Sequence, residues 1–583
     1  MSLFCEDLSS SIGEVKLLSF VRIPLSLPAI ALLCCSTASP PSMPAAVMVS
    51  IGQNFTGSTL NYNNYNGIPP DPNGAVGPRH FVEFINGNFT LYNKTNSNSV
   101  RVSDAKFWAN AGVMLASSDV LSDPRVVYDP TVQRWFASEI DFDGNAAASG
   151  GDPTLEANDF LIAVSATSDP TSSPGSWHGF LFLADSDTGY FADFPTLGVD
   201  GTAVYLSGDM YHGETNEVGA SLISIPKSDL IAASPTIANR TSFGILELSE
   251  HGQILQPNNC FDGSVTGKIL AASDIGNDSE PHSNIVCSTV LNGGGPDATL
   301  SPATFIPTMS WIVPDSPYLP APSFHPIQPD GSDTLQANEA RFSAKVPAVG
   351  GVLYAVHNTY LNNRVAIRWY RVRGADNALL ESGTIADPDL DLFFPSIAVN
   401  LYGVVVVCFN ACGPGSGNYI SCYAVAGQTI NGVTTFGNRL LLQAGVTNYH
   451  DLNEIVGDLF GETTTSRWGD YSATSVDPVD PNRFWTIQMY PSGTDPNSLD
   501  SGVWSTQITE LITSLQPLLS IQPAGTNVTI SWPNIAGYHL QFATNLPSIS
   551  WSNVVQSALT NGSDVSVLLP ISAGKRFFRL IKP

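Results

Sequence analysis

Three arginines of this sequence each lie within three positions of a carboxylate. The pairs are Asp123 with Arg125, Glu339 with Arg341, and Arg467 with Asp470. A guanidinium group binds a carboxylate through two parallel N–H donors, so three arginines around one pocket would suit an acidic sugar. The pattern therefore predicts a ligand site built from Arg125, Arg341 and Arg467, with Trp468 and Asp470 beside them.

The neighbouring residues allow two kinds of catalysis. One would use Tyr471 with a base within catalytic reach. Two carboxyl groups about 5 to 10 Å apart would also suit glycoside hydrolysis. An alternative is structural, because Asp-Pro entries favour turns and each arginine could form an ion pair with a neighbouring unit.

A repeated pattern of strands must bring these residues together. Residues 393–411 contain a buried strand, a tight turn at 400–403 and a second apolar strand. Similar segments begin at Asp71, Asp123, Asp193, Gln256, Asn338, Phe393 and Arg467. Their spacing of roughly 50 to 85 residues is typical of four-stranded units arranged radially. The sequence thus predicts an all-β protein whose residues 46–513 form a seven-bladed β-propeller.

In such a ring the first strand of each unit lines a central channel, so residues at the strand entries converge in one funnel. Trp135, Phe484 and Trp485 fall on second strands and are expected to pack between units. The last copy is one strand short, and residues 47–55 are expected to supply its outer strand. A six-bladed ring is the alternative, if residues 291–334 are an insertion that absorbs one copy.

The composition changes near residue 514. Residues 514–583 show alternating strands broken by short turns, which predicts a small separate β-sandwich with Trp532, Leu540, Trp551 and Phe578 in its core. The spacing of NVTISWP, YHLQFATNL and FFRLIKP resembles the fibronectin type III-like modules at the C-terminal ends of bacterial secreted proteins. That resemblance implies a spacer or attachment module.

The residues of the funnel resemble the sialidase (neuraminidase) superfamily of propellers. Members of that superfamily use an arginine triad for the substrate carboxylate, a tyrosine nucleophile helped by a glutamate, and an aspartate acid/base. The resemblance implies Arg125, Arg341 and Arg467 as the triad, Tyr471 with Glu339 as the nucleophile pair, and Asp71 or Asp123 as the acid/base. The sequence has no S-x-D-x-G-x-x-W motif and no Arg-Ile-Pro signature, so the shared feature is the general architecture.

Two further groups of residues predict local chemistry. Asp185, Asp187 and Asp193 lie in DSDTGYFAD, whose alternating carboxylates and Gly189 resemble the start of a calcium loop. Cys408 and Cys422 are expected on adjacent strands; if the connecting turn is centred near Gly415, they lie opposite one another and form a disulfide.

Charge and the N-terminal residues indicate where the protein acts. With 51 acidic and 24 basic residues the net charge is −27, which argues against nucleic acid or an anionic membrane as the main partner. Residues 17–39 hold a short apolar run followed by small residues, as in a secretory signal, and the run is too short for a transmembrane span. We therefore expect residues 1–45 to be a signal region and the protein to be a secreted or cell-surface monomer.

Two functions remain open. The first is a binding or scaffold protein whose propeller face recognises a glycan or an extracellular protein. The second is a glycan-active enzyme, either a sialidase-like hydrolase or a polysaccharide lyase, acting on an acidic sugar in the same funnel. Separate, capped aspartates would favour the first, whereas a pair of carboxyl groups beside the arginines would favour the second.

Overall fold

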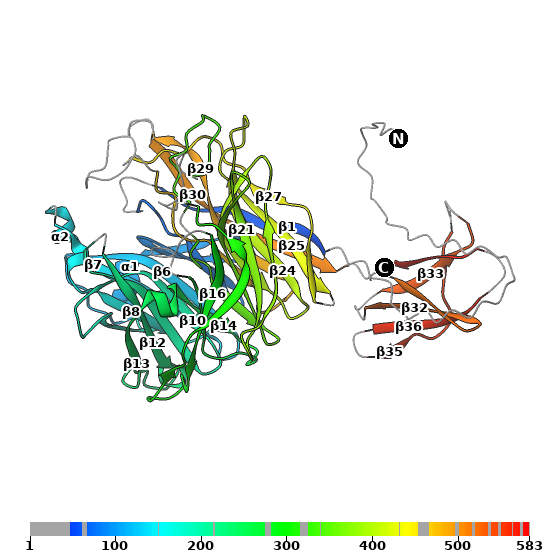
Figure 1. Ribbon diagram of the computed structural model, residues 1–583, viewed down its shortest axis with the longest axis horizontal. Helices are drawn as coiled ribbons and strands as arrows, with labels where there is room; N and C mark the ends of the chain where they lie inside the picture. Colours follow the sequence, from blue (N-terminus) through cyan, green and yellow to red (C-terminus); the bar gives the residue numbers. More distant parts are fainter. Residues whose placement is uncertain are drawn as a thin grey trace. The chain divides into compact units, whose positions relative to one another are not determined.

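The computed structural model describes residues 47–581 except 61–66, 150, 214–215, 274–280, 315–324, 338–339, 431, 453–465, 496–500, 516–518, 534–537, 546–549, 562–563 and 572–574. Its contacts divide this chain into two compact units, Val47–Ser514 and the part that begins at Leu515 (Figure 1). The expected signal region, residues 1–45, lies outside the described residues. No helix among the described residues is long and apolar enough to cross a membrane.

In the larger unit each predicted copy forms its own antiparallel group of strands. The first copy forms β2 (Asn73–Val76), β3 (His80–Ile85), β4 (Asn88–Asn93) and β5 (Ser99–Ser103). The second forms β6 (Asp119–Asp129), β7 (Arg134–Asp143), β8 (Asp159–Ser165) and β9 (Trp177–Leu183). The third forms β10 (Phe191–Val199), β11 (Ala203–Tyr211), β12 (Glu217–Pro226) and β13 (Thr241–Leu246).

The next two groups share one sheet, because β14 and β19 pair in parallel. The fourth copy forms β14 (Gln253–Cys260), β15 (Lys268–Ala272) and β16 (His282–Leu291), with β17 (Thr299–Leu300) and β18 (Thr304–Trp311) both paired to β16. The fifth forms β19 (Val346–Val349), β20 (Val352–Leu361), β21 (Arg364–Arg373) and β22 (Leu379–Ile385). Within the range 291–334, Thr299–Leu300 and Thr304–Trp311 therefore contribute strands to the fourth group.

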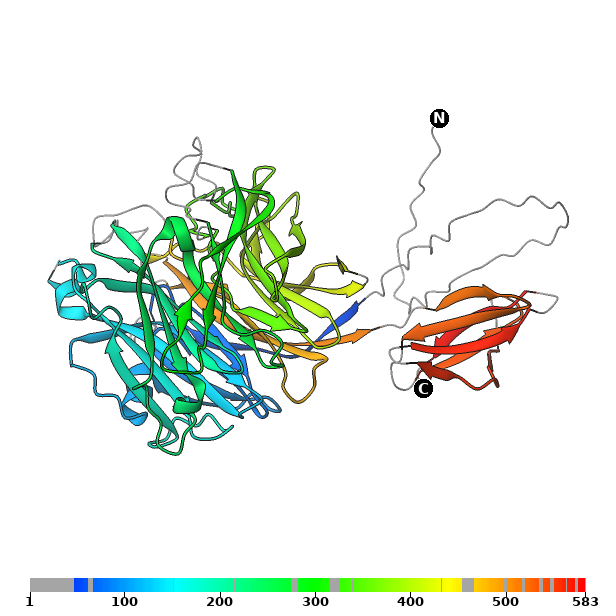
Figure 2. The same ribbon diagram turned by 60° about the horizontal axis from the view of Figure 1, so that its bottom comes forward.

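The last two groups complete the larger unit. The sixth copy forms β23 (Asp391–Val399), β24 (Val404–Cys412) and β25 (Ser421–Ile430), with β26 (Val433–Phe436) and β27 (Leu440–Gln443) both paired to β25. The last forms β28 (Ala473–Val476), β29 (Arg483–Asp495) and β30 (Ser501–Leu515), and β1 (Val47–Thr59) pairs with β30. The prediction that residues 47–55 supply the missing outer strand is confirmed, and the blue strand β1 lies beside the orange strand β30 in Figure 2.

Short helices lie between strands. They are α1 (Asp104–Asn110), α2 (Gly144–Ala148), the 3-10 turn η1 (Pro153–Leu155), α3 (Lys227–Leu230) and α4 (Leu248–His251).

The first strands of the groups contact one another in circular order. The sequence of contacts is β2, β6, β10, β14, β19, β23 and β28, and β28 contacts β2 again. The strands thus surround one axis, with all their amino-terminal ends toward one mouth. This arrangement makes the larger unit propeller-like, as the repeat predicted.

Turns at the carboxyl ends of several first strands share one side-chain to backbone hydrogen bond. The side-chain Oδ1 of Asp129, Asp200, Asn400 and Asp477 accepts a hydrogen bond from the backbone N–H two residues later, at 2.7 to 3.0 Å. Asp and Asn favour such turns because their short side chains replace a backbone acceptor. This is the physical basis of the repeated turn in the sequence.

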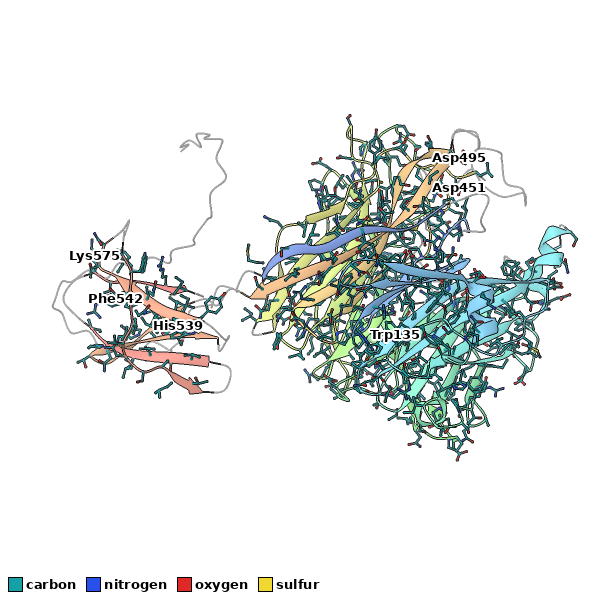
Figure 3. The ribbon with its side chains drawn as sticks, turned by 180° about the vertical axis from the view of Figure 1, so that it is seen from behind. Trp135, Asp451, Asp495, His539, Phe542 and Lys575 are labelled. Carbon is teal, nitrogen blue, oxygen red and sulfur yellow. The ribbon has the colours of Figure 1, made fainter. Side chains whose placement is uncertain are left out.

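The core lies between neighbouring groups of strands. Trp135 on β7 belongs to a cluster that joins the first two groups, and Trp485 on β29 belongs to one that joins the last group to the first. Figure 3 shows Trp135 among the side chains of this unit. Phe484 is also fully buried. The prediction that Trp135 and Trp485 pack between units is confirmed.

The predicted disulfide between Cys408 and Cys422 is wrong, since both thiols are free. Cys408 lies opposite Ala424, and Cys422 lies opposite Asn410. This register centres the hairpin on Ser416 instead of Gly415, and a shift of one residue in the turn moves each partner by two positions. The two cysteines are therefore diagonal neighbours.

The smaller unit has two sheets over one core. One sheet has the order β31 (Ser520–Ala524), β32 (Asn527–Pro533), β36 (Asp564–Pro570) and β35 (Leu559–Asn561). The other has the order β34 (Ser552–Asn553), β33 (His539–Ala543) and β37 (Phe577–Ile581). Trp532 and Leu540 are buried in the shared core, and Phe578 packs against it.

Candidate functional site

The entries to the first strands share an unusual backbone. Asp71, Asp123, Phe194, Ile254 and Phe394 have φ values of 47°, 61°, 48°, 53° and 47°. Non-glycine residues seldom adopt this left-handed region, and such strain is found where surrounding structure holds it in place. In β6, β10, β14 and β23 the pairing with the second strand also shifts register just after this residue. A bulge of this kind bends a strand and changes the direction of its side chains.

Asp123, Tyr471 and Arg125 form a buried group at this mouth. The Tyr471 hydroxyl donates to Asp123 Oδ2 at 2.5 Å, and Ser122 Oγ donates to Asp123 Oδ1 at 3.0 Å. The Arg125 guanidinium carbon lies 3.3 Å from the centre of the Tyr471 ring, and Arg125 Nε donates to the carbonyl oxygen of Pro195 at 2.6 Å. The sequence prediction correctly brought these side chains together. However, Arg125 is 3% exposed, so it faces the protein and not a ligand.

Burial sets the protonation of this group. It raises the pKa of Asp123 to about 6, with Asp193 and Asp470 adding to the effect. It also raises the pKa of Tyr471 well above its ordinary value, although Arg125 works against this. A tyrosine nucleophile needs a lowered pKa and access to substrate, whereas Tyr471 has a raised pKa and is 2% exposed.

Asp71 lies beside this group and is tied to it through Asn86. Asp71 Oδ2 accepts from Asn86 Nδ2 at 2.8 Å, and Asn86 Oδ1 accepts from the backbone N–H of Asp123 at 2.9 Å. Asp71 Oδ1 accepts from the backbone N–H of Asp470 at 2.8 Å. Burial, followed by Asp470 and Asp123, raises the pKa of Asp71 well above its ordinary value. Asp71 and Asp123 are thus capped side chains that hold the strand entries.

The accessible charges at the mouth come from other residues. The Arg467 side chain is 39% exposed and that of Asp470 is 14% exposed, and Arg467 Nη2 lies 3.4 Å from Asp470 Oδ2. Arg341 is half-buried, with its guanidinium carbon 4.9 Å from the centre of the Phe194 ring. Asp193 is exposed. Desolvation, with Asp470 adding to it, raises the pKa of Asp193, whereas the backbone N–H of Phe194 and the charges of Arg341 and Arg467 oppose the rise. These residues place two cations and two carboxylates at the mouth.

Trp468 is placed in the core instead of at the mouth. It is 1% exposed, its Nε1 donates to Asn410 Oδ1 at 3.1 Å, and its ring meets that of Tyr449 edge-on at 4.7 Å. Glu339, the expected partner of Tyr471, lies outside the described residues.

A pair of carboxyl groups that the sequence did not suggest lies near Arg341. Asp209 on β11 and Glu217 on β12 lie close together. Glu217 Oε2 accepts from Gln253 Nε2 at 2.8 Å, and Asp209 Oδ1 accepts from the backbone N–H of Ile254 at 3.1 Å. Burial and Glu217 raise the pKa of Asp209 well above its ordinary value. The register places Asp209 opposite Ala220 and Glu217 opposite Tyr211, with a shift between Met210 and Tyr211, and no sequence pattern signals this arrangement.

Two of the expected calcium ligands, Asp185 and Asp187, lie in a turn. Asp185 Oδ1 accepts from the backbone N–H of Asp187 at 3.0 Å, and its other oxygen accepts from the Thr188 hydroxyl and, at 3.2 Å, from the backbone N–H of Tyr190. Burial acts to raise the pKa of Asp185, but these bonds outweigh it and lower the pKa. No cluster of three or more His, Cys, Asp or Glu side chains suited to a metal occurs within the described ranges.

Comparisons with known proteins assign this chain to no family. No model of a known protein family matches the sequence. No curated protein sequence matches it either.

Solved structures that resemble the backbone of this chain have low sequence identity to it. An α-L-arabinanase of Penicillium chrysogenum, in complex with arabinobiose, is 10% identical, with a TM-score of 0.34, covering 79% of this chain and 98% of that one. A protein of unknown function from Dyadobacter fermentans is 10% identical, with a TM-score of 0.32, covering 79% and 97%. A sialidase of Trypanosoma rangeli is 10% identical, with a TM-score of 0.28, covering 91% and 59%. Because these scores are low, the propeller-like architecture rests on the sheets themselves.

Proposed function

We propose that this protein is a secreted or cell-surface seven-bladed β-propeller that binds an acidic glycan at the mouth formed by the strand entries. The observation that carries the proposal is the accessibility of Arg467 and Arg341, beside Asp193 and Asp470. A guanidinium binds a sugar carboxylate, and the neighbouring carboxylates accept bonds from sugar hydroxyls. In this proposal residues 514–583 form a fibronectin type III-like β-sandwich that acts as a spacer.

The distribution of burial supports binding over nucleophilic catalysis. Tyr471 and Asp123 are 2% and 5% exposed, and Arg125 is occupied by Pro195 and the Tyr471 ring. The candidate nucleophile and one member of the expected arginine triad are thus parts of the fold. The remaining arginines, Arg341 and Arg467, are the ligand-facing pair.

The experiment is an array of acidic and neutral glycans, read with the purified protein for retention and for released sugar. Arg341→Ala and Arg467→Ala should each weaken retention of acidic glycans by about tenfold or more, as expected for loss of a charged hydrogen bond. Arg373→Ala is the matched control, because the Arg373 side chain is 51% exposed and pairs only locally with Asp376 at 3.1 Å. Equal retention by all four proteins would refute the proposed site.

A glycan-active enzyme is the second candidate, and Asp193 favours it. This carboxyl group is exposed and its pKa is raised, as a general acid requires. If the wild-type protein releases sugar and Asp193→Asn still retains the glycan but releases none, the protein is an enzyme and the binding proposal is wrong.

A further inference from the structure

A cavity lies at the end of the ring opposite the strand entries. Its volume is about 360 Å³, and it lies among the carboxyl-terminal halves of the first strands. Residues from six of these strands line it: Val76, Val127, Asn259, Ala348, Val399 and Val476. Such a volume with an apolar lining is typical of small-molecule sites. It shares no residue with the mouth that holds Arg341 and Arg467.

Lys345 brings a cation to this apolar cavity. It lines the cavity just before β19, and its Nζ reaches across to the carbonyl oxygens of Gly74 on β2, at 2.9 Å, and Val126 on β6, at 2.6 Å. An ammonium group has three N–H donors, so these two bonds leave one donor. Lys345 is half-buried, and within the described ranges no carboxylate forms an ion pair with it, although a cation removed from water favours one.

Asn259 supplies a second donor in the same cavity. Its Oδ1 accepts from the backbone N–H of Val199 at 3.1 Å, which fixes the amide. Asn259 is 7% exposed, and its Nδ2 has no hydrogen-bond partner among the described residues. An unsatisfied buried donor costs about 1 to 3 kcal/mol unless a ligand or water accepts from it.

The other charged side chains of the cavity are occupied. Asp262 accepts from the backbone N–H groups of Ser264, at 2.9 Å, and Gly350, at 2.7 Å. Asp477 forms an ion pair with Lys94 at 2.5 Å. Two hydrogen-bond donors in the apolar wall therefore remain for a ligand: the Lys345 ammonium group and Asn259 Nδ2.

We propose that this cavity binds a small apolar molecule with a single carboxylate, which accepts from Lys345 Nζ and Asn259 Nδ2. The hydrocarbon part would lie against the valines and Ala348, and the carboxylate would neutralise the lysine. Burial, with a smaller contribution from Arg125, lowers the pKa of Lys345 to about 7 in the free protein. The charged groups near Lys345 are Arg125, which lowers its pKa, and Asp262 and Asp477, which lie on the cavity wall. A bound carboxylate should raise the pKa of Lys345, because a nearby negative charge favours the protonated ammonium group.

Decanoate is the probe, and decan-1-ol of the same length is its uncharged counterpart. Titration calorimetry with the full chain should show decanoate bound about tenfold or more tightly than decanol at pH 6. Decanoate affinity should fall as the pH rises from 6 to 8.5, because Lys345 loses its proton over that range, while decanol affinity should not change.

Asn259→Asp is the decisive variant, because it keeps the acceptor for Val199 N–H and replaces the free donor with a carboxylate. It should weaken decanoate about tenfold or more and leave decanol unchanged. Lys345→Met should do the same, and Lys106→Met, at an exposed position, should have no effect. Val476→Phe should fill the cavity and weaken both probes.

Either of two results would overturn the proposal. One is that the folded wild-type protein binds neither probe, or binds both equally. The other is that Asn259→Asp binds decanoate as the wild type does. A thermal unfolding transition for each variant establishes that the variant is folded. If Lys345→Met does not fold, the affinities of Asn259→Asp and the pH dependence of decanoate binding test the proposal.

Discussion

The Tyr471 hydroxyl donates to the Asp123 carboxylate at 2.5 Å, and this bond joins the entry of the last group of strands to that of the second. Both side chains are almost completely buried, and the Arg125 guanidinium covers the tyrosine ring. The pair stabilises the ring of strand entries.

We expect Tyr471→Phe to destabilise the protein by about 1 to 3 kcal/mol, because Asp123 Oδ2 loses its buried donor. Since the tyrosine bond lowers the pKa of Asp123, the variant should also raise that pKa above about 6. Urea unfolding at several pH values measures both effects. Tyr402→Phe, at a 47% exposed position, is the control. Glycan retention should survive in Tyr471→Phe, and its complete loss in a folded variant would mean that the hydroxyl contacts the ligand.

Stability should fall as the pH rises from about 4 to 7. Burial raises the pKa of Asp141 to about 6, although the backbone N–H of Asp159 opposes this by donating at 2.8 Å. The ordinary value in an unfolded chain is about 3.9. A raised folded pKa stabilises the protein fully below the unfolded value, and this contribution is lost as the pH passes through 6.

Asp141→Asn isolates this contribution, because the amide oxygen can still accept from Asp159. Relative to the variant, the wild type should lose about 2 kcal/mol of unfolding free energy between pH 4 and 7. Denaturant unfolding across this range measures the difference, with Asp376→Asn, whose side chain is 52% exposed, as the control. Parallel curves for wild type and Asp141→Asn would contradict the assignment.

The buried cysteines should resist thiol reagents in the native protein. Cys408 and Cys422 are fully buried, and burial raises the pKa of Cys408 to about 11. A thiolate is the reactive form, so both lack access and charge. Mass-spectrometric mapping after treatment with iodoacetamide should find both residues unmodified before unfolding and modified after it, without reductant. Detection of a peptide cross-linked through Cys408 and Cys422 would show that the disulfide exists.

Trp468 should behave as a core residue. Replacing a buried tryptophan with alanine costs about 3 to 5 kcal/mol, and the bond from Trp468 to Asn410 would also be lost. Trp468→Phe should cost less and should leave glycan affinity unchanged. Thermal unfolding and the glycan array test these two statements; a stable Trp468→Ala with weakened binding would place the indole in the ligand site.

The strands and the repeated turns could be read from the sequence, but the orientation of entry residues could not. Alternating apolar residues and the turn aspartates, such as Asp129 and Asp200, are local signals. The bulge before Arg125 and the left-handed Asp123 decide which side chains reach solvent, and these depend on neighbouring strands. For the same reason the sequence pattern places Trp468 at the mouth and gives no signal of the Asp209–Glu217 pair.

The pairing of β1 with β30 sets the order in which this protein completes its fold. The backbone N–H of Gln53 donates to Glu510 Oε2 at 2.9 Å, so residues separated by 457 positions must meet. A ribosome finishes β1 long before its partner exists, and β1 must wait while the intervening strands are made. Contacts of such separation form late and slow folding. The pairing of β1 therefore follows synthesis of β30, and the unpaired β1 is the edge at risk of misassembly until then.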